Sequence, residues 1–175
     1  MGDSLSAAYG IDVSRAWPAL LQKRLERENY HYQIINMSVS GYTTSNGLSV
    51  LPDALKRYQP NITLIALGAN DGLRGLDISI IKNNLSKMIV LAKDANSKVL
   101  LIGIRLPPNY GISYTLAFQT IFLDLAKKHQ ISLIPLMLKN IDENSAMFQA
   151  DRLHPAVGAQ ETIVNNIWPV LQSLL

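Results

Sequence analysis

Short apolar runs alternate with longer amphipathic segments along this chain, and the alternation limits the folds open to it. Residues 62–67 and 99–104 are nearly continuous in apolar character, and shorter strand-like runs cover residues 32–36 and 132–135. Buried parallel strands have this composition because helices cover both faces of their sheet. We therefore predict an α/β fold with a parallel sheet covered on both faces, as a single domain over residues 1–175.

The segments between these runs carry apolar residues at helical spacing. The expected helices cover residues 14–28, 45–58, 78–95, 113–129 and 156–174, with a helical turn at 137–142. Pro52 is expected near a first turn, where proline is tolerated. Residues 105–111 contain too much proline and glycine for regular structure and predict a loop.

Composition excludes several classes of function. The net charge is +3, and the Lys and Arg residues are scattered, so we expect no nucleic-acid partner. No apolar run approaches the roughly 18 residues of a membrane-spanning helix, so no stable membrane insertion is expected. The chain has no cysteine, which excludes disulfides, cysteine-ligated metals and a cysteine nucleophile.

Four polar stretches are candidates for a site. Ser40-Gly41 and residues 68–71 follow strand-like runs, and ligands of parallel α/β proteins bind beyond the carboxyl ends of the strands. Residues 2–4 read Gly-Asp-Ser, a tight turn that presents one hydroxyl. Near the other end, residues 151–155 read Asp-Arg-Leu-His-Pro.

Ser4 is the candidate nucleophile. A serine hydroxyl needs a base to take its proton, and the usual base is a histidine oriented by a carboxylate. Of the three histidines, His154 alone has a carboxylate, Asp151, three residues before it, whereas His31 and His129 are expected to be solvated. The same Asp-x-x-His-Pro spacing also fits a helix entry with an acidic cap, so the spacing leaves both interpretations open.

Acyl transfer also needs donors aimed at the developing oxyanion. The Ser4 and Gly41 backbone N–H groups and the Asn70 side-chain amide are available at the strand ends. Gly41 can equally be a turn glycine with a positive φ, and Asn70 can be a turn former. Asp3 and Asp71 are expected to hold loops by hydrogen bonds rather than to take part in the chemistry.

Taken in this order, the motifs resemble the SGNH (GDSL) hydrolase family, in particular its bacterial multifunctional thioesterase I/protease I/lysophospholipase type, also described as arylesterases. The matching stretches are residues 2–6, 40–44, 68–75, 104–111 and 151–155. The resemblance implies the SGNH hydrolase fold, a flavodoxin-like three-layer α/β/α sandwich. It also implies a periplasmic or exported location, which nothing else in the chain indicates.

The resemblance assigns roles residue by residue. Ser4 would be the nucleophile, His154 the base and Asp151 its partner, while Ser4, Gly41 and Asn70 would form the oxyanion hole. Two loops would flank the acyl chain, through Leu73, Leu76, Leu106, Pro107 and Tyr110. The implied substrate is a small-molecule acyl ester or thioester, with no metal or organic cofactor, on a monomer or weak homodimer.

Three residues depart from the family pattern. Tyr42 stands where an acidic residue is common, and Ala69 and Arg152 stand where glycine is common. We expect the first two to alter pocket polarity or loop pose. Arg152 either lowers the pKa of Asp151 or points to solvent.

A larger departure lies at the start of the chain. In the family an apolar strand precedes Gly-Asp-Ser and lies centrally in the sheet, but here only Met1 stands there. We expect the sheet to lack this first, central strand, as from a misplaced start or a truncation, and to fold poorly unless another segment fills the gap. A strand contributes about 1 kcal/mol per net hydrogen bond and roughly 1.5–3 kcal/mol per buried aliphatic side chain.

Three functions fit these observations. The leading one is a serine hydrolase that cleaves medium- to long-chain acyl esters and thioesters through an acyl-enzyme. The second is an SGNH carbohydrate acetylesterase, against which the apolar residues 73–76 and 106–108 speak. The third is a truncated, non-catalytic chain that binds lipid or a partner.

Overall fold

A parallel β-sheet forms the middle of the molecule, as the sequence predicts. The structure is a computed structural model that describes residues 1–141 and 144–175. The strands, in their order across the sheet, are β1 (Ile62–Ile65), β2 (Lys98–Ile102) and β3 (Ser132–Ile134). Leu64 lies opposite Leu100, and Leu100 lies opposite Ser132, so all three carboxyl ends meet at one edge.

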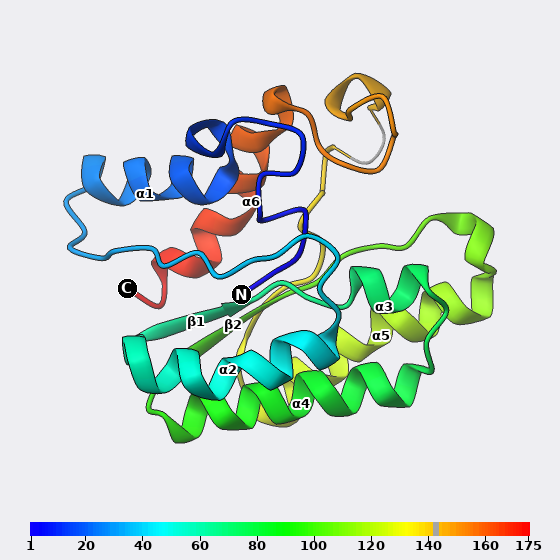
Figure 1. Ribbon diagram of the computed structural model, residues 1–175, viewed down its shortest axis with the longest axis horizontal. Coiled ribbons are helices and arrows are strands. Elements are labelled where there is room, and N and C mark those ends of the chain that lie inside the picture. The colour runs from blue at the N-terminus through cyan, green and yellow to red at the C-terminus, as the bar shows by residue number, and fades with distance from the viewer. Residues whose placement is uncertain (142–143) are drawn as a thin grey trace.

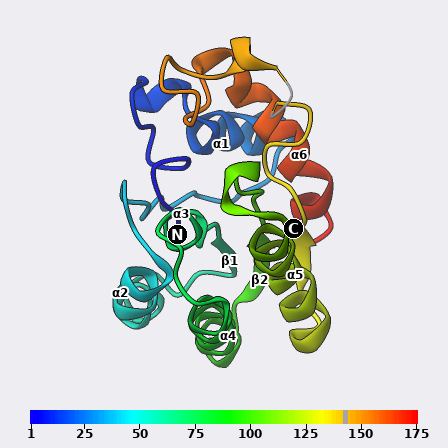
Figure 2. The same ribbon diagram turned by 90° about the vertical axis from the view of Figure 1, so that its right-hand side faces the viewer.

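Helices cover both faces of this sheet. They are α1 (Trp17–Arg27), α2 (Thr44–Tyr58), α3 (Ala69–Leu73), α4 (Ile78–Asp94), α5 (Ile112–His129) and α6 (Gln160–Gln172). Shorter 3₁₀ helices cover Val13–Arg15, Pro108–Tyr110, Ser145–Met147 and Val157–Ala159. Helices α1 and α6 lie above the sheet in Figure 1, and α2, α4 and α5 lie below it; Figure 2 shows the same three layers end-on.

Each face of the sheet has its own apolar core. Below the sheet, β1 and β2 pack against side chains of α2, α4 and α5, including Leu55, Leu85, Met88, Phe118 and Phe122. Above it, the strands pack against α1 and α6 through residues such as Trp17, Leu21, Ile163, Ile167 and Trp168. The second core matters most for the site, because it fixes the two ends of the chain on the same face.

The first two residues occupy the end of a strand position beside β1. The Met1 ammonium donates to the Leu64 carbonyl at 3.0 Å, and the Ala66 N–H donates to the Met1 carbonyl at 3.0 Å. Gly2 forms a parallel bridge with Ala66, and its carbonyl accepts from the Val39 N–H at 3.1 Å. Met1 and Gly2 therefore hold the Gly-Asp-Ser turn on the sheet with only the last residues of a strand.

An apolar groove continues this strand position beyond Met1. Its volume is about 480 Å³, and its walls come from α1, α2, β1 and residues 31–38. Residues 32–36, predicted to be a strand, have no strand pairing, so that prediction was wrong. The groove separates this segment from β1, and a backbone without a neighbour within hydrogen-bonding distance cannot form a ladder.

Other elements differ from prediction in detail. Residues 69–73, in which Asn70 was a candidate turn former, form the short helix α3. Pro52 lies in the middle of α2 rather than near its first turn, because the helix begins at Thr44 after a Thr43 cap. The side chains of Leu51 and Leu55 hold the helix on the core across this proline. The turn expected at 137–142 is present as far as residue 141, and Asp142 lies outside the described residues.

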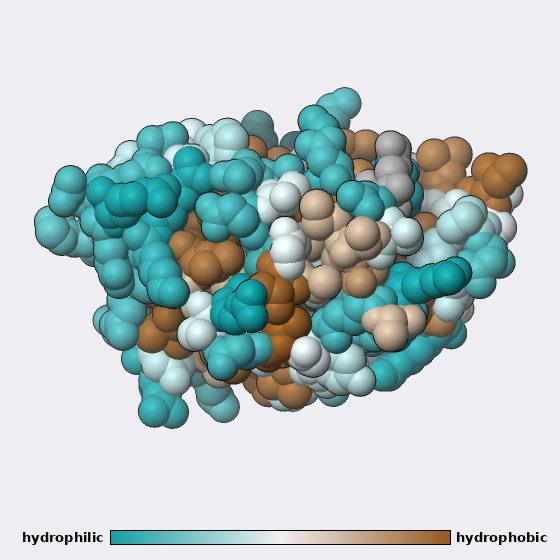
Figure 3. Space-filling model, turned by 90° about the horizontal axis from the view of Figure 1, so that it is seen from above, coloured by the Kyte–Doolittle hydropathy of each residue, from teal (hydrophilic) through white to brown (hydrophobic). Residues whose placement is uncertain are grey.

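The face of the molecule that Figure 3 shows is mainly hydrophilic. Seen from above, in Figure 3, apolar side chains are exposed near the middle of the face, between hydrophilic residues. Within the described residues, no helix is both long and apolar enough to cross a bilayer.

The groove predicts the effect of an N-terminal extension. Five apolar residues joined to Met1 should add a strand beside β1 and raise the melting temperature by roughly 5–10 °C, since about 1 kcal/mol shifts a domain of this size by about 2–4 °C. A Gly/Ser extension of equal length is the control for added mass. Equal melting temperatures for the two extended chains would contradict the prediction.

The same extension should change the pH dependence of stability. Burial lowers the pKa of the Met1 ammonium from 8.0 to about 6. Between these values the unfolded chain binds more protons than the folded chain, so stability rises with pH across this window. An apolar extension replaces the amine by a peptide N–H and should remove that rise in melts at pH 6 and pH 8.

Candidate active site

The candidate site lies at the carboxyl edge of the sheet. Ser4 follows the Gly2–Ala66 bridge, α3 follows β1, and the loop that carries Asp151 and His154 precedes α6. The blue start of the chain and the orange loop near its end come together at the top of Figure 1. The stretches predicted to converge therefore do so, although they are spread over the whole chain.

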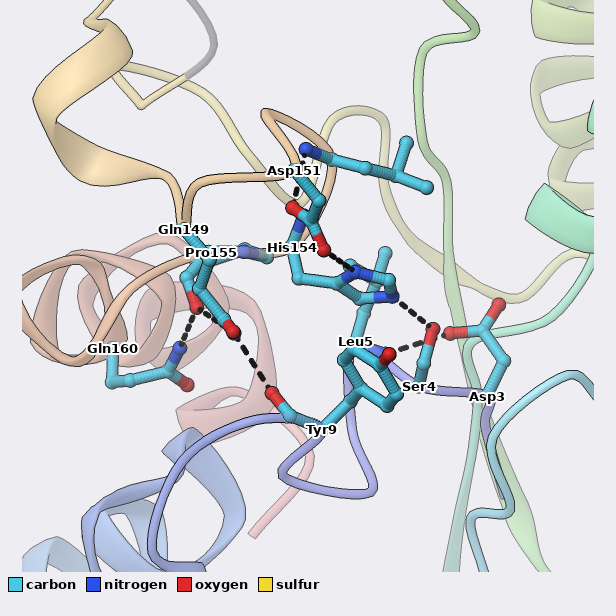
Figure 4. A network of polar contacts seen from close by, with 10 residues as sticks. Asp3, Ser4, Leu5, Tyr9, Gln149, Asp151, His154, Pro155 and Gln160 are labelled. Atoms are coloured by element: carbon cyan, nitrogen blue, oxygen red, sulfur yellow. Dashed lines mark hydrogen bonds and ion pairs between the residues drawn. The ribbon is translucent and has the colours of Figure 1, made fainter.

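Ser4, His154 and Asp151 form a continuous hydrogen-bonded row, drawn in Figure 4. His154 Nε2 lies 2.9 Å from Ser4 Oγ, and His154 Nδ1 lies 2.7 Å from Asp151 Oδ2. With Nδ1 protonated towards the carboxylate, Nε2 presents a lone pair to the serine hydroxyl. The row matches the arrangement in which a base, held in one tautomer, activates a hydroxyl.

Asp151 is held as a carboxylate by its own loop. Its Oδ1 accepts from the backbone N–H groups of His154, at 3.0 Å, and Leu153, at 2.9 Å. These hydrogen bonds, with that of the His154 ring, lower the pKa of Asp151 to about 2. The acidic group thus caps a turn and orients the imidazole at once. It does not cap a helix entry, because the helices that follow begin at Val157 and Gln160 without a side-chain cap.

Arg152 lies between these residues in a left-handed conformation. Its φ is +56°, a region that favours glycine, which accounts for the glycine common at this position. The side chain is exposed, and hydrogen bonds rather than the guanidinium lower the pKa of Asp151.

The predicted oxyanion donors share one cavity with Ser4. Gly41 and Asn70 both line it, and Gly41 has a φ of +82° with open space where a Cβ would stand. Asn70 Nδ2 donates to the Tyr42 carbonyl at 3.0 Å, which leaves its second hydrogen for another acceptor. Among the described residues, the Ser4 and Gly41 N–H groups have no hydrogen-bond partner.

Buried polar contacts hold the Gly41 turn against α3. Asp71, which is fully buried, accepts from the Thr44 N–H at 2.8 Å and from its hydroxyl at 2.5 Å. Arg74 donates to the Gly41 carbonyl at 3.2 Å. Because Asn70 and Asp71 are adjacent on α3, these contacts fix Gly41 and Asn70 relative to each other. Asp71 has the loop-holding contacts expected from the sequence.

The cavity at Ser4 has a volume of about 660 Å³ and is mainly apolar. Three of the residues expected at the acyl chain line it, namely Leu73, Leu106 and Pro107. Leu76 and Tyr110 are outside this lining, and Tyr110 instead donates its hydroxyl to the Leu73 carbonyl at 2.8 Å. Sequence reasoning missed further wall residues: Tyr9, Ile104, Leu138, Phe148 and Leu153.

The remaining histidines lie away from the row. His31 is exposed, as predicted. His129 is only partly exposed, and its Nε2 lies 2.8 Å from Ser86 Oγ, so the expectation of a solvated ring was wrong there. The α4–α5 contact creates this pair, which is not visible in either helix sequence alone.

Comparison with known proteins decides the family of this chain. Residues 1–160 match the GDSL-like lipase/acylhydrolase family. The chain belongs to this family. Esterase TesA of Pseudomonas aeruginosa is 45% identical over 175 residues, which are 100% of this chain and 87% of that relative. An arylesterase of Vibrio mimicus is 44% identical over 93% of this chain and 82% of the relative.

The family fold is equally clear in solved structures. The crystal structure of TesA matches with a TM-score of 0.97 at 45% identity, over 99% of this chain and 97% of that one. The esterase EstA from Pseudoalteromonas, solved as inhibited by monoethylphosphonate, matches with a TM-score of 0.95 at 35% identity, over 99% and 94% of the two chains. The resemblance inferred from the motifs is thereby confirmed, and so is the SGNH hydrolase fold.

The buried carboxylate of Asp3, next to Ser4, predicts how the stability of this GDSL-family protein depends on pH. The carboxylate is 2% exposed, accepts from the Leu5 N–H at 3.0 Å, and burial raises its pKa from 3.8 to about 6. A raised acid pKa contributes stability at low pH that is lost as pH rises through about 6. Asp3→Asn keeps the acceptor without the charge, so it should melt roughly 5–10 °C above wild type at pH 8 and close to it at pH 4. A lower melting temperature at pH 8 would contradict the assigned cause.

Proposed function

We propose that this chain is a serine hydrolase that cleaves acyl esters and thioesters through an acyl-enzyme on Ser4. The observation that carries the proposal is the row from Ser4 Oγ through His154 to Asp151, with hydrogen bonds of 2.9 and 2.7 Å. A serine in this arrangement can lose its proton to the imidazole as it attacks a carbonyl carbon.

Acylation would begin with that attack. His154 Nε2 takes the Ser4 proton, and the Ser4 oxygen bonds to the carbonyl carbon of the substrate. The resulting imidazolium faces Asp151, whose lowered pKa keeps it ionised and therefore able to stabilise the charge. His154 then returns the proton to the leaving alcohol or thiol as its bond to the carbonyl carbon breaks.

The tetrahedral intermediate would place its negative oxygen among the Ser4 N–H, the Gly41 N–H and the Asn70 amide. Preorganised donors stabilise charge that develops in the transition state, without reorganisation at that moment. Deacylation repeats the sequence with water, whose proton His154 accepts, and releases the acid and free Ser4.

The cavity supports an apolar acyl group. Leu73, Leu106 and Pro107 form one side of the space next to Ser4, and Leu138 and Phe148 also line it. Burial of apolar carbon is favourable by about 0.8 kcal/mol per CH₂, so such walls favour longer acyl chains over acetyl. A relative 39% identical over the whole chain, from Escherichia coli K12, is named thioesterase 1/protease 1/lysophospholipase L1, which supports ester and thioester substrates here.

Ser4→Ala should abolish turnover of p-nitrophenyl esters, because it removes the hydroxyl that lies 2.9 Å from His154 Nε2 and would form the acyl-enzyme. The measurement is initial rate at matched folded protein, judged by melting temperature. Activity above one hundredth of wild type in this variant would reject Ser4 as the nucleophile. No turnover by wild type would favour the non-catalytic alternative.

Asn70→Ala should lower kcat by about 10²–10³, the usual effect of losing one oxyanion donor. The matched control is Asn165→Ala, which removes an exposed amide whose oxygen accepts from Arg24 Nη1 at 2.8 Å and which does not line the cavity. Steady-state kinetics of the two variants separate the roles. A loss of less than threefold in Asn70→Ala would make Asn70 only a turn residue.

Acyl-chain preference tests the carbohydrate acetylesterase alternative. Octanoyl p-nitrophenyl ester should give a higher kcat/KM than the acetyl ester, because the cavity walls are apolar. The measurement is kcat/KM for both esters below their aggregation limits. A preference for acetyl would favour the acetylesterase.

A further inference from the structure

Gln149 connects the two ends of the chain beside the candidate site. Its side-chain Nε2 donates to the Tyr9 carbonyl at 2.8 Å and lies 3.3 Å from the Pro155 carbonyl. Tyr9 belongs to the turn that presents Ser4, and Pro155 directly follows His154. One amide group thus spans the gap between the nucleophile turn and the histidine loop, as Figure 4 shows.

The backbone of Gln149 closes the histidine loop itself. Its N–H donates to the His154 carbonyl at 2.8 Å, and its carbonyl accepts from the Arg152 N–H at 2.9 Å. Phe148 also pairs with Pro155 in an antiparallel bridge. The loop that carries the imidazole is therefore closed at its base, where Gln149 pairs with His154 and Phe148 pairs with Pro155.

The nucleophile turn is shaped to receive this side chain. A Cβ on Gly10 would lie 2.1 Å from Gln149 Oε1, and the φ of Gly10 is +72°, so both space and conformation favour glycine. The ring of Tyr9 packs on the His154 ring, with centroids 4.3 Å apart and planes tilted by 35°. The turn thus contacts the histidine loop at two places, the Gln149 side chain and the His154 ring.

Both segments are loops outside the sheet, so no strand pairing sets their separation. Gln160, which is buried, accepts from the Trp17 N–H at 3.0 Å and donates to Pro155 at 3.3 Å, and so anchors the histidine loop to α1. Trp17 in turn donates its indole N–H to the Leu5 carbonyl at 3.1 Å, so this anchor reaches the Ser4 turn through Trp17, whereas Gln149 joins the two loops directly. A shift of about 1 Å between catalytic groups can cost a hundredfold in rate, so the direct link through Gln149 is consequential.

We propose that Gln149 is a positioning residue that sets the Ser4–His154 geometry, because its side-chain amide donates to both the Tyr9 and the Pro155 carbonyl. This role rests on the proposed serine hydrolase function. The Pro155 carbonyl still accepts from the Gln160 amide when Gln149 is replaced. Loss of the Gln149 amide therefore removes mainly the link to Tyr9. Gln149 is not among the residues that line the cavity, so substrate binding should not depend on it.

The experiment compares wild type with Gln149→Ala and Gln149→Met on a soluble p-nitrophenyl ester. Both variants should lose about tenfold in kcat, the equivalent of one hydrogen bond, while KM changes by less than twofold. Methionine keeps the length of the side chain but not its donor, so equal losses assign the effect to the amide. Gln172→Ala, which removes an exposed amide that donates to Tyr30 Oη at 3.3 Å, should retain wild-type kcat.

A double-mutant cycle with Gly10→Ala gives an independent readout. Gly10→Ala should displace the Gln149 side chain and lower kcat in wild type, but it should cost less in the Gln149→Ala background, where nothing is left to displace. Additive losses in kcat would contradict a shared contact.

Two results would overturn the proposal while wild type remains active. One is kcat within twofold of wild type in both Gln149 variants. The other is a loss of activity that only follows the loss of folded protein, measured by circular dichroism at the assay temperature, because that is a purely structural role. A wild type without ester turnover would instead reject the proposed function, which separates the two failures.

Discussion

The hydrogen bond between Ser4 Oγ and His154 Nε2, 2.9 Å long, joins two residues that lie 150 positions apart in the chain. No local turn can create such a contact, so it depends on the core above the sheet. There α1 and α6 pack together through residues such as Trp17 and Ile163, and the Trp17 N–H donates to Gln160. The chemistry of the site therefore depends on tertiary packing of the first and last helices.

The two loops that form this contact, the histidine loop and the Ser4 turn, are held in place by different sets of contacts. The histidine loop is tied to α6, to Gln149 and to its own Asp151 cap. The Ser4 turn is held to β1 by the backbone of Met1 and Gly2, beside a groove of about 480 Å³. The Trp17 indole donates to its Leu5 carbonyl at 3.1 Å, and the Asn36 amide donates to its Ser6 carbonyl at 2.8 Å. A buried ammonium at Met1 is costly, because burial opposes its charge. Contacts between the two loops, such as Gln149 to Tyr9, add to these anchors and act directly on the Ser4–His154 pair.

Sequence reasoning found what depends on local pattern and chemical type. Continuous apolar runs identified the three strands, and the hydroxyl, imidazole and carboxylate identified a possible row before any geometry was known. It failed where the outcome depends on a neighbour: residues 32–36 have strand composition but face a groove, and residues 69–73 form a helix where Asn70 was a candidate turn former. Gln149 carries no signal in the sequence, since a lone glutamine gains its meaning only from the carbonyls that it meets.

The central claim is that the joined ends of the chain make Ser4 a nucleophile. Peptide mapping by mass spectrometry after reaction with a fluorophosphonate ester tests it directly, because such reagents phosphonylate an activated serine hydroxyl. The account predicts one adduct per chain, on the peptide that contains Ser4, and none after denaturation. An adduct on another serine of the folded protein, or no adduct in a chain that hydrolyses esters, would contradict it.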